Sequence, residues 1–129
     1  MNVLVADTLM DTQMPGPGGA EIAAVPAIQV GELLVYPRPA VRHTAGVEPA
    51  ELVLDLRCWL ISLPGGLSVP VECVSAQAAV DAAQAFRADA ESGAVGSYSP
   101  AELAKWAAWW CGHRPDAAVL PAVSGGDRR

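Results

Sequence analysis

Apolar and polar residues change their spacing along the chain, and these changes divide it into elements. Residues 3–13 carry apolar positions at helical spacing, with Asn2 as a possible cap and Pro15 as a stop, which predicts a short N-terminal helix. The run Pro15-Gly16-Pro17-Gly18-Gly19 then predicts a flexible loop.

Two apolar segments follow at residues 22–30 and 32–36, with Gly31 between them. Pro26 favours an edge strand or an extended segment for the first, because proline cannot donate to a central ladder. The second is apolar at successive positions, which is typical of a strand buried on both faces. Residues 37–50 contain prolines and glycine without periodicity, so we expect a loop there.

Residues 52–74 give the clearest pattern, a β-hairpin with a tight turn at Gly65-Gly66. In the register that this turn sets, an apolar face contains Cys58 opposite Cys73. Pro64 lacks an N–H that would help to close such a turn, so a wider loop stays open as an alternative. A wider loop would slip the pairing and could turn every side chain to the other face.

Two helices are predicted after the hairpin, at about 76–91 and 100–111. Ser75 is a cap for the first, whose apolar face is rich in alanine, and Gly93 ends it. The second opens with the capping box Ser99-Pro-Ala-Glu102. A short apolar segment at 117–123 is the one late strand candidate.

The elements predict an α+β fold, with a small and mostly antiparallel sheet packed against the two C-terminal helices. We expect a single domain over residues 1–123 and a flexible tail over residues 124–129. An apolar fraction of 52% suits a chain of 129 residues with one core, although much of that fraction is alanine and valine.

Charge narrows the function classes. The formal net charge is −6 and Lys105 is the single lysine, so a basic surface for sequence-specific nucleic-acid binding is not expected. The sequence shows neither a signal peptide nor an apolar run long enough to span a membrane. Three scattered cysteines argue against a disulfide scaffold. From these observations together we expect the protein in the cytoplasm of its host.

Candidate chemistry is sparse. Cys111 and His113 form the one close Cys/His pair, but a zinc site needs further ligands. Cys111 would also lie at the negative end of a helix dipole, which disfavours a thiolate nucleophile. Asp89 and Glu91 lack a companion base, so solvated surface carboxylates are expected. We therefore expect no catalytic residue, no metal and no cofactor.

Tryptophans suggest a contact surface instead. In the predicted hairpin register Trp59 and Ile61 lie on the polar face, together with Glu72, and an exposed aromatic beside an aliphatic residue marks a possible interface. Trp109 points away from the apolar face of its helix, near Glu102 and Lys105. The interface hypothesis comprises Trp59, Ile61, Glu72, Tyr36 and Trp109; the alternative is that another segment of the chain covers the hairpin.

With these elements in order, the chain resembles the tail-terminator or neck subunits of long-tailed bacteriophages, particularly those of GC-rich hosts. The resemblance covers roughly residues 3–91 and rests on the strand Pro26-Ala-Ile-Gln-Val-Gly31, on residues 51–62 and on the alanine-rich helix. It implies a ring-forming, non-enzymatic virion protein at the head–tail connection, with other virion proteins as partners. After that helix the family returns to the sheet, whereas this chain continues into a second, tryptophan-rich helix.

Two other classes stay open from the sequence. One is a monomeric protein-binding module, an inhibitor or adaptor of a GC-rich bacterium or its phage. The other is a small cysteine-dependent enzyme, which would need Cys111.

Overall fold

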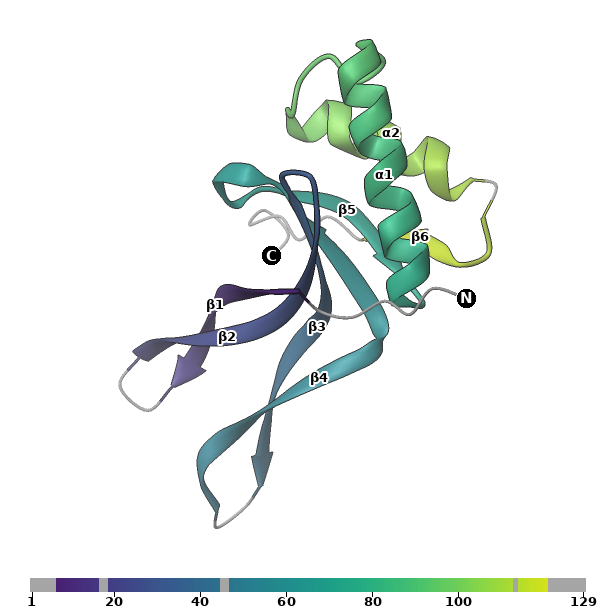
Figure 1. Cartoon of the computed structure of the whole chain (residues 1–129). Coiled ribbons are helices and arrows are strands. Elements are labelled where there is room, and N and C mark those ends of the chain that lie inside the picture. Colours follow the sequence, from purple (N-terminus) through teal and green to yellow (C-terminus); the bar gives the residue numbers. More distant parts are fainter. Residues whose placement is uncertain (1–6, 17–18, 45–46, 113, 121–129) are drawn as a thin grey trace.

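The fold is an antiparallel meander followed by two helices. The computed structural model describes residues 7–16, 19–44, 47–112 and 114–120. The sheet has the order β1-β2-β3-β4-β5-β6, so every strand pairs with its neighbour in sequence (Figure 1). The elements are β1 (Thr8–Gly16), β2 (Gly19–Val30), β3 (Leu33–Thr44), β4 (Val47–Ser62), β5 (Ser68–Cys73), α1 (Ala76–Ser92), α2 (Pro100–Cys111) and β6 (Ala117–Val119). The predicted α+β class is confirmed, and the predicted tail at 124–129 lies outside the described residues.

Both helices begin where the sequence places their caps. The Ser75 hydroxyl accepts a hydrogen bond from the Ala78 amide at 3.1 Å, and the Ser99 hydroxyl accepts one from the Glu102 amide at 3.2 Å. These bonds satisfy amides that have no partner within the helix. At the end of α1, Gly93 adopts a left-handed conformation with φ of 88°, as a glycine C-cap does.

The predicted N-terminal helix is wrong where the structure describes it. Residues 8–16 form β1, which pairs with β2 from Thr8 opposite Ala27 to Gly16 opposite Gly19. Pro15 and Gly16, which we predicted to open a loop, are therefore part of the strand, and residues 3–6 lie outside the described residues. Pairing with the next strand, β2, overrides the helical spacing, which is a weak signal over so short a segment.

The predicted loop at 37–50 is also wrong, because its described residues belong to the long strands β3 and β4. Pro37 and Pro39 are both inside β3, opposite Trp59 and Leu54. Between Pro37 and Arg38 the pairing jumps from Trp59 to Asp55, so part of β4 bulges out. Prolines are tolerated in strands next to such irregularities, where the regular ladder is interrupted.

Polar groups of the bulged segment are satisfied locally. The Asp55 carboxylate accepts the Arg57 amide at 2.9 Å, and the Leu56 carbonyl accepts the Trp59 indole N–H at 2.9 Å. The Leu56 side chain is 65% exposed at this bend.

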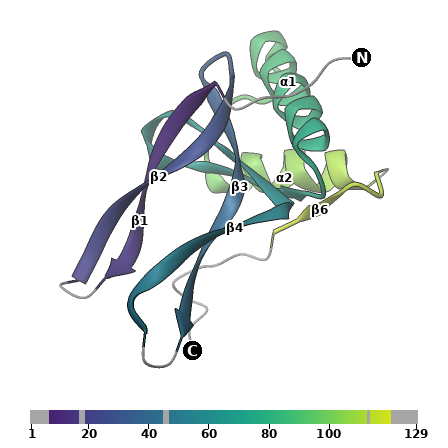
Figure 2. The same ribbon diagram turned by 60° about the horizontal axis from the view of Figure 1, so that its bottom comes forward.

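The sheet divides into two ribbons. β2 pairs with β3 only from Ile28 to Val30, against Leu33 to Val35. Beyond this short contact, β1 and β2 continue as one two-stranded ribbon, and β3 and β4 continue as another beyond Pro37. We call these the β1/β2 arm and the β3/β4 arm. Figure 2 shows both arms extending away from the helices.

The hairpin of β4 and β5 exists, but its register differs from the prediction. Pro64, Gly65 and Gly66 form a 3₁₀ turn, and the Leu63 amide donates to the Leu67 carbonyl, so the connection is the wider loop. Ser62 pairs with Ser68 and Ile61 with Val69, one residue away from the expected register. Val69 is buried, as the apolar face of the predicted hairpin required, whereas Ile61 moves from the predicted polar face to the buried one.

Cys58 and Cys73 are consequently not opposite each other. Trp59 pairs with Cys73, and the pairing between β4 and β5 shifts again before Ile61. Pro70 lies within this irregular part of β5, so its missing N–H interrupts no regular ladder. Its carbonyl accepts a hydrogen bond from the Leu120 amide at 2.9 Å.

One apolar core joins the sheet to both helices. α1 contacts β2, β3, β4 and β5, whereas α2 contacts β5 and β6. The fully buried residues come from strands and helices alike and include Leu33, Val35, Ile61, Val69, Val71, Ala79, Ala83, Phe86 and Ala107. Because most buried residues of α1 are alanines, the helix can approach the sheet closely, and the larger side chain of Phe86 fills the remaining space.

Substitution of Gly31 should lower the stability of the fold. Gly31 has φ of +62° in the turn from β2 to β3, a conformation that costs an L-residue about 1–2 kcal/mol. An added Cβ would also meet the Arg87 guanidinium, which forms an ion pair with Glu32 and would have to move. We expect Gly31→Ala to lower the free energy of unfolding by about 1–2 kcal/mol in urea denaturation followed by tryptophan fluorescence.

Gly96→Ala is the matched control. A Cβ at Gly96 meets nothing within 4 Å, and its φ is not in the left-handed region. This substitution should leave the unfolding midpoint nearly unchanged or raise it slightly. Equal losses for the two variants would contradict the assignment of strain to the β2–β3 turn.

Candidate functional site

The hairpin residues predicted for an interface are not exposed as expected. Ile61 is fully buried in the core, so its prediction as an exposed contact is wrong, and the one-residue register slip is the reason. Trp59 is half-buried, and its indole packs against the same core. The argument from an exposed indole on the hairpin therefore fails.

Glu72 and Tyr36 lie on the sheet face that points away from the helices, since they alternate with the buried Val71, Cys73 and Val35. Glu72 accepts a hydrogen bond from the Cys58 thiol at 3.4 Å and lies 4.0 Å from the Arg38 guanidinium. For Tyr36, burial raises the pKa of the phenol above its ordinary value, although a hydrogen bond with Ser68 opposes this. Both side chains are engaged within their own chain, and their role at an interface stays a prediction.

Trp109 is exposed, as its position on the helix predicted, with 58% of its surface accessible. It belongs to α2, whereas the other four predicted residues belong to β3, β4 and β5. Because Ile61 is fully buried, the five residues do not all contribute to an exposed surface.

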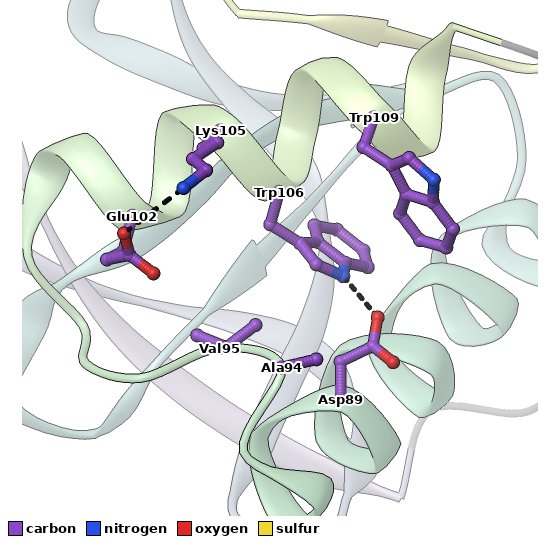
Figure 3. A pocket seen from close by; sticks show the side chains of 7 residues that line it. All are labelled: Asp89, Ala94, Val95, Glu102, Lys105, Trp106 and Trp109. Atoms are coloured by element: carbon purple, nitrogen blue, oxygen red, sulfur yellow. Dashed lines mark hydrogen bonds and ion pairs between the residues drawn. The ribbon is translucent and has the colours of Figure 1, made fainter.

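A pocket of about 340 Å³ opens beside Trp109. It lies between α2 and the end of α1 with the turn that follows it (Figure 3). We call it the tryptophan pocket; its lining residues are Asp89, Ala94, Val95, Glu102, Lys105, Trp106 and Trp109. It combines indole surface, small aliphatic side chains and charged groups, which is the usual composition of a ligand site.

Hydrogen bonds hold the pocket in shape. The Trp106 indole N–H donates to a carboxylate oxygen of Asp89 at 2.7 Å, which ties α2 to α1 (Figure 3). Asp89 is thus not the solvated surface carboxylate that we expected. The Val95 amide donates to the Asp89 carbonyl at 3.1 Å and fixes the turn after α1.

An aromatic cluster stands behind the pocket. Trp106 stacks on Trp110 with ring centroids 5.5 Å apart and an interplanar angle of 10°, and it meets the edge of Phe86 at 5.2 Å. The Arg114 guanidinium carbon lies 3.7 Å from the centre of the Trp110 ring. This cation–π contact shows that indoles of α2 accept a guanidinium.

The spacing of residues in the sequence predicts part of this site. The helical spacing places Trp109 near Glu102 and Lys105, as expected, whereas the buried Trp106 belongs to the apolar face of the helix. The contribution of Asp89 and Val95 depends on how α1 and α2 cross, which no local pattern encodes.

A second hollow of about 270 Å³ lies beside the β4 bulge. Its lining includes Arg38, Glu72, Cys58 and Cys73. Burial raises the pKa of the Cys73 thiol to about 12, and nearby acidic groups add to the effect. Burial also raises the pKa of Cys58, with Glu72 contributing. Thiols held protonated in this way are poor nucleophiles at neutral pH.

The pKa of the Cys111 thiol is raised as well. Cys111 is partly buried at the end of α2, and burial together with Asp116 raises the pKa of its thiol. His113, the other member of the sequence pair, lies outside the described residues.

Among the residues that the structure describes, no group of three or more Cys, His, Asp or Glu side chains is placed to hold a metal ion. Neither α1 nor α2 has the length and apolar character to cross a membrane. No protein-family model matches the sequence, no curated protein matches it, and no solved structure matches the fold.

The raised pKa of Cys73 predicts a pH-dependent stability. Below the ordinary thiol pKa of 9.0 the group is protonated in both the folded and unfolded states, so its contribution to stability is complete. From 9.0 to about 12 the unfolded chain loses the proton and the folded chain keeps it. The free energy of unfolding should therefore fall with rising pH by about 1.4 kcal/mol per pH unit from this group.

Urea denaturation at pH values on both sides of 9.0 measures this slope. Cys73→Ala should flatten the slope above 9.0, although it also lowers stability at every pH by leaving a small cavity. An unchanged slope in the variant would show that other groups, such as Tyr36, cause the pH dependence.

Proposed function

We propose that this protein is a non-enzymatic assembly subunit that forms a homo-oligomer through its two arms. The supporting observation is the division of the sheet. Past the contact at Ile28 to Val30, each arm is a two-stranded ribbon to which no third strand pairs among the residues that the structure describes. Isolated two-stranded ribbons are only marginally stable in water, so such arms gain stability when another surface covers them.

Exposed apolar residues at the roots of the arms support this proposal. Leu9 on β1 is 67% exposed, and Leu56 at the β4 bulge is 65% exposed. In the β3/β4 arm, Pro39 lies opposite Leu54 and both are half-buried. A second subunit that packs on these residues would remove their apolar surface from water.

The order of the strands also suits repeated assembly. β1 and β6 are the two ends of the strand order, so the sheet has two different edges. Contacts between unlike surfaces of identical subunits generate closed rings when the rotation between subunits allows it.

Within this class we propose a tail-terminator or neck subunit of a long-tailed bacteriophage, assembled in the host cytoplasm and incorporated into the virion with other virion proteins. The net charge of −6 is consistent with a ring through which DNA passes without adhering. The raised pKa of the Cys111 thiol, caused by burial and by Asp116, supports this structural role over a cysteine-dependent enzyme.

Light scattering after size-exclusion chromatography tests the assembly proposal. In a shortened variant, residues 41–52 are deleted and Ala40 is joined to Val53, which lie opposite each other, through Asn-Gly. We expect the unmodified chain to be an oligomer and the shortened variant a monomer. Near-ultraviolet circular dichroism of the tryptophan cluster should be retained, because α1, α2 and the core contact are unchanged.

A substitution pair provides the matched control. Leu56→Arg places a charge at the root of the β3/β4 arm, whereas Leu67→Arg places the same charge at the β4–β5 turn, where Leu67 is 42% exposed. Leu56→Arg should weaken self-association by at least about tenfold, since it buries an unpaired charge, and Leu67→Arg should not. A stable monomer of the unmodified chain at high concentration would overturn the proposal.

A monomeric protein-binding module is the second candidate, and the tryptophan pocket is the observation that favours it. Exposed tryptophans beside a pocket are typical anchors of protein interfaces. This candidate predicts a monomer whose binding to a protein partner depends on Trp109 and is independent of the arms.

A further inference from the structure

We propose that the tryptophan pocket binds an arginine side chain from a basic segment of a different protein. The site is separate from the arms, and the inference does not depend on the assembly proposal. Three properties of the pocket lead to it: an exposed indole, an aliphatic wall and an excess of negative charge. A fourth observation is a guanidinium contact with Trp110, elsewhere on the same helix.

The indole surface is available and well supported. Trp109 is 58% exposed, and its ring centroid lies 6.3 Å from that of Trp106. Trp106 is 6% exposed and is held by its hydrogen bond to Asp89, so Trp109 packs against a fixed neighbour. An aromatic ring that is already positioned costs a ligand little ordering entropy.

Across the pocket, Ala94 and Val95 provide an aliphatic wall (Figure 3). The three methylene groups of an arginine can pack on such a surface while the guanidinium reaches charged groups at the rim.

The charged residues that line the pocket favour a cationic ligand. The lining contains two carboxylates, Asp89 and Glu102, and one ammonium, Lys105. Lys105 lies 3.8 Å from Glu102, and its side chain is 79% exposed, so a ligand can displace it into water. The net charge of −6 attracts a basic segment, and with 8 Lys and Arg against 14 Asp and Glu the chain offers few basic segments of its own, which argues for a different protein as the occupant.

A guanidinium fits better than an ammonium. It is planar, stacks on indole faces and donates two parallel hydrogen bonds to a carboxylate. Arg114, 3.7 Å from the Trp110 ring centre, shows the same kind of contact one turn from Trp106 on the same run of tryptophans. A ligand arginine would stack on Trp109 and donate to Glu102.

The test uses the indole N–H signals of the full-length protein in ¹H–¹⁵N spectra. The probe is acetyl-Gly-Arg-Gly-amide, and its control contains citrulline, which has nearly the same shape without the charge. We expect the arginine peptide to shift the Trp109 signal and, to a lesser extent, that of Trp106. The signal of Trp59, which belongs to β4, should not move.

Two conservative variants separate recognition from folding. Glu102→Gln keeps the size of the side chain but removes a carboxylate, and it should weaken binding of the arginine peptide by about tenfold. Lys105→Gln removes the competing ammonium and should strengthen binding by about threefold. Asp89 is left unchanged because it supports Trp106.

Three results would overturn the proposal: equal shifts with the citrulline peptide, weaker binding after Lys105→Gln, or binding unaffected by both variants. Trp109→Ala should abolish the response of Trp106 to the peptide while the urea unfolding midpoint stays close to that of the unmodified chain. The peptide is titrated at constant protein concentration, so the oligomeric state can be measured in the same samples. A failure of arginine binding can thus be distinguished from a failure of the assembly proposal.

Discussion

Close packing of α1 on the sheet is the contact on which the rest of the structure depends. Ala79 and Ala83 are fully buried at this contact, and their small side chains bring the helix near Val35 and Ile61. Phe86 is the one bulky residue of α1 in this layer, and its ring also meets Trp106, so it couples α2 to the same core. The helices cover only the part of the sheet that they contact, and beyond this part the strands separate into two arms. The tryptophan pocket forms where α1 meets α2.

Local signals in the sequence were sufficient for some elements and not for others. The helices follow from their caps at Ser75 and Ser99, which act over a single turn and need no tertiary context. The register of the β4–β5 hairpin did not follow, because Pro64 converts the expected tight turn into a 3₁₀ turn and moves the pairing by one residue. The prolines of β3 predict a loop from the sequence, although a bulge at Pro37 lets the strand continue.

The candidate site divides in the same way. Exposure of Trp109 could be predicted because it depends only on the helix face that a residue occupies. Exposure of Ile61 could not, because in a strand a shift of one residue exchanges buried and exposed faces. The role of Asp89 was missed for a third reason: its partner, the Trp106 indole, is 17 residues away and meets it only after two helices have packed. Contacts between elements are therefore the part of the site that spacing rules leave undetermined.

The meander topology has a consequence for how the chain reaches its native state. Strands β1 to β5 each pair with the next strand in sequence, so most of the sheet can zip together through short hairpins. Pairing between neighbouring strands keeps the contact order low for a β-rich protein. Low contact order favours rapid folding, because closing each short connection costs little chain entropy before the strands form their contacts. Within the described part of the chain, the pairing that spans the most sequence is that of β5 with β6, which both helices separate. Docking of this last strand is thus the natural final event, in which the C-terminal segment closes over a sheet that is already formed.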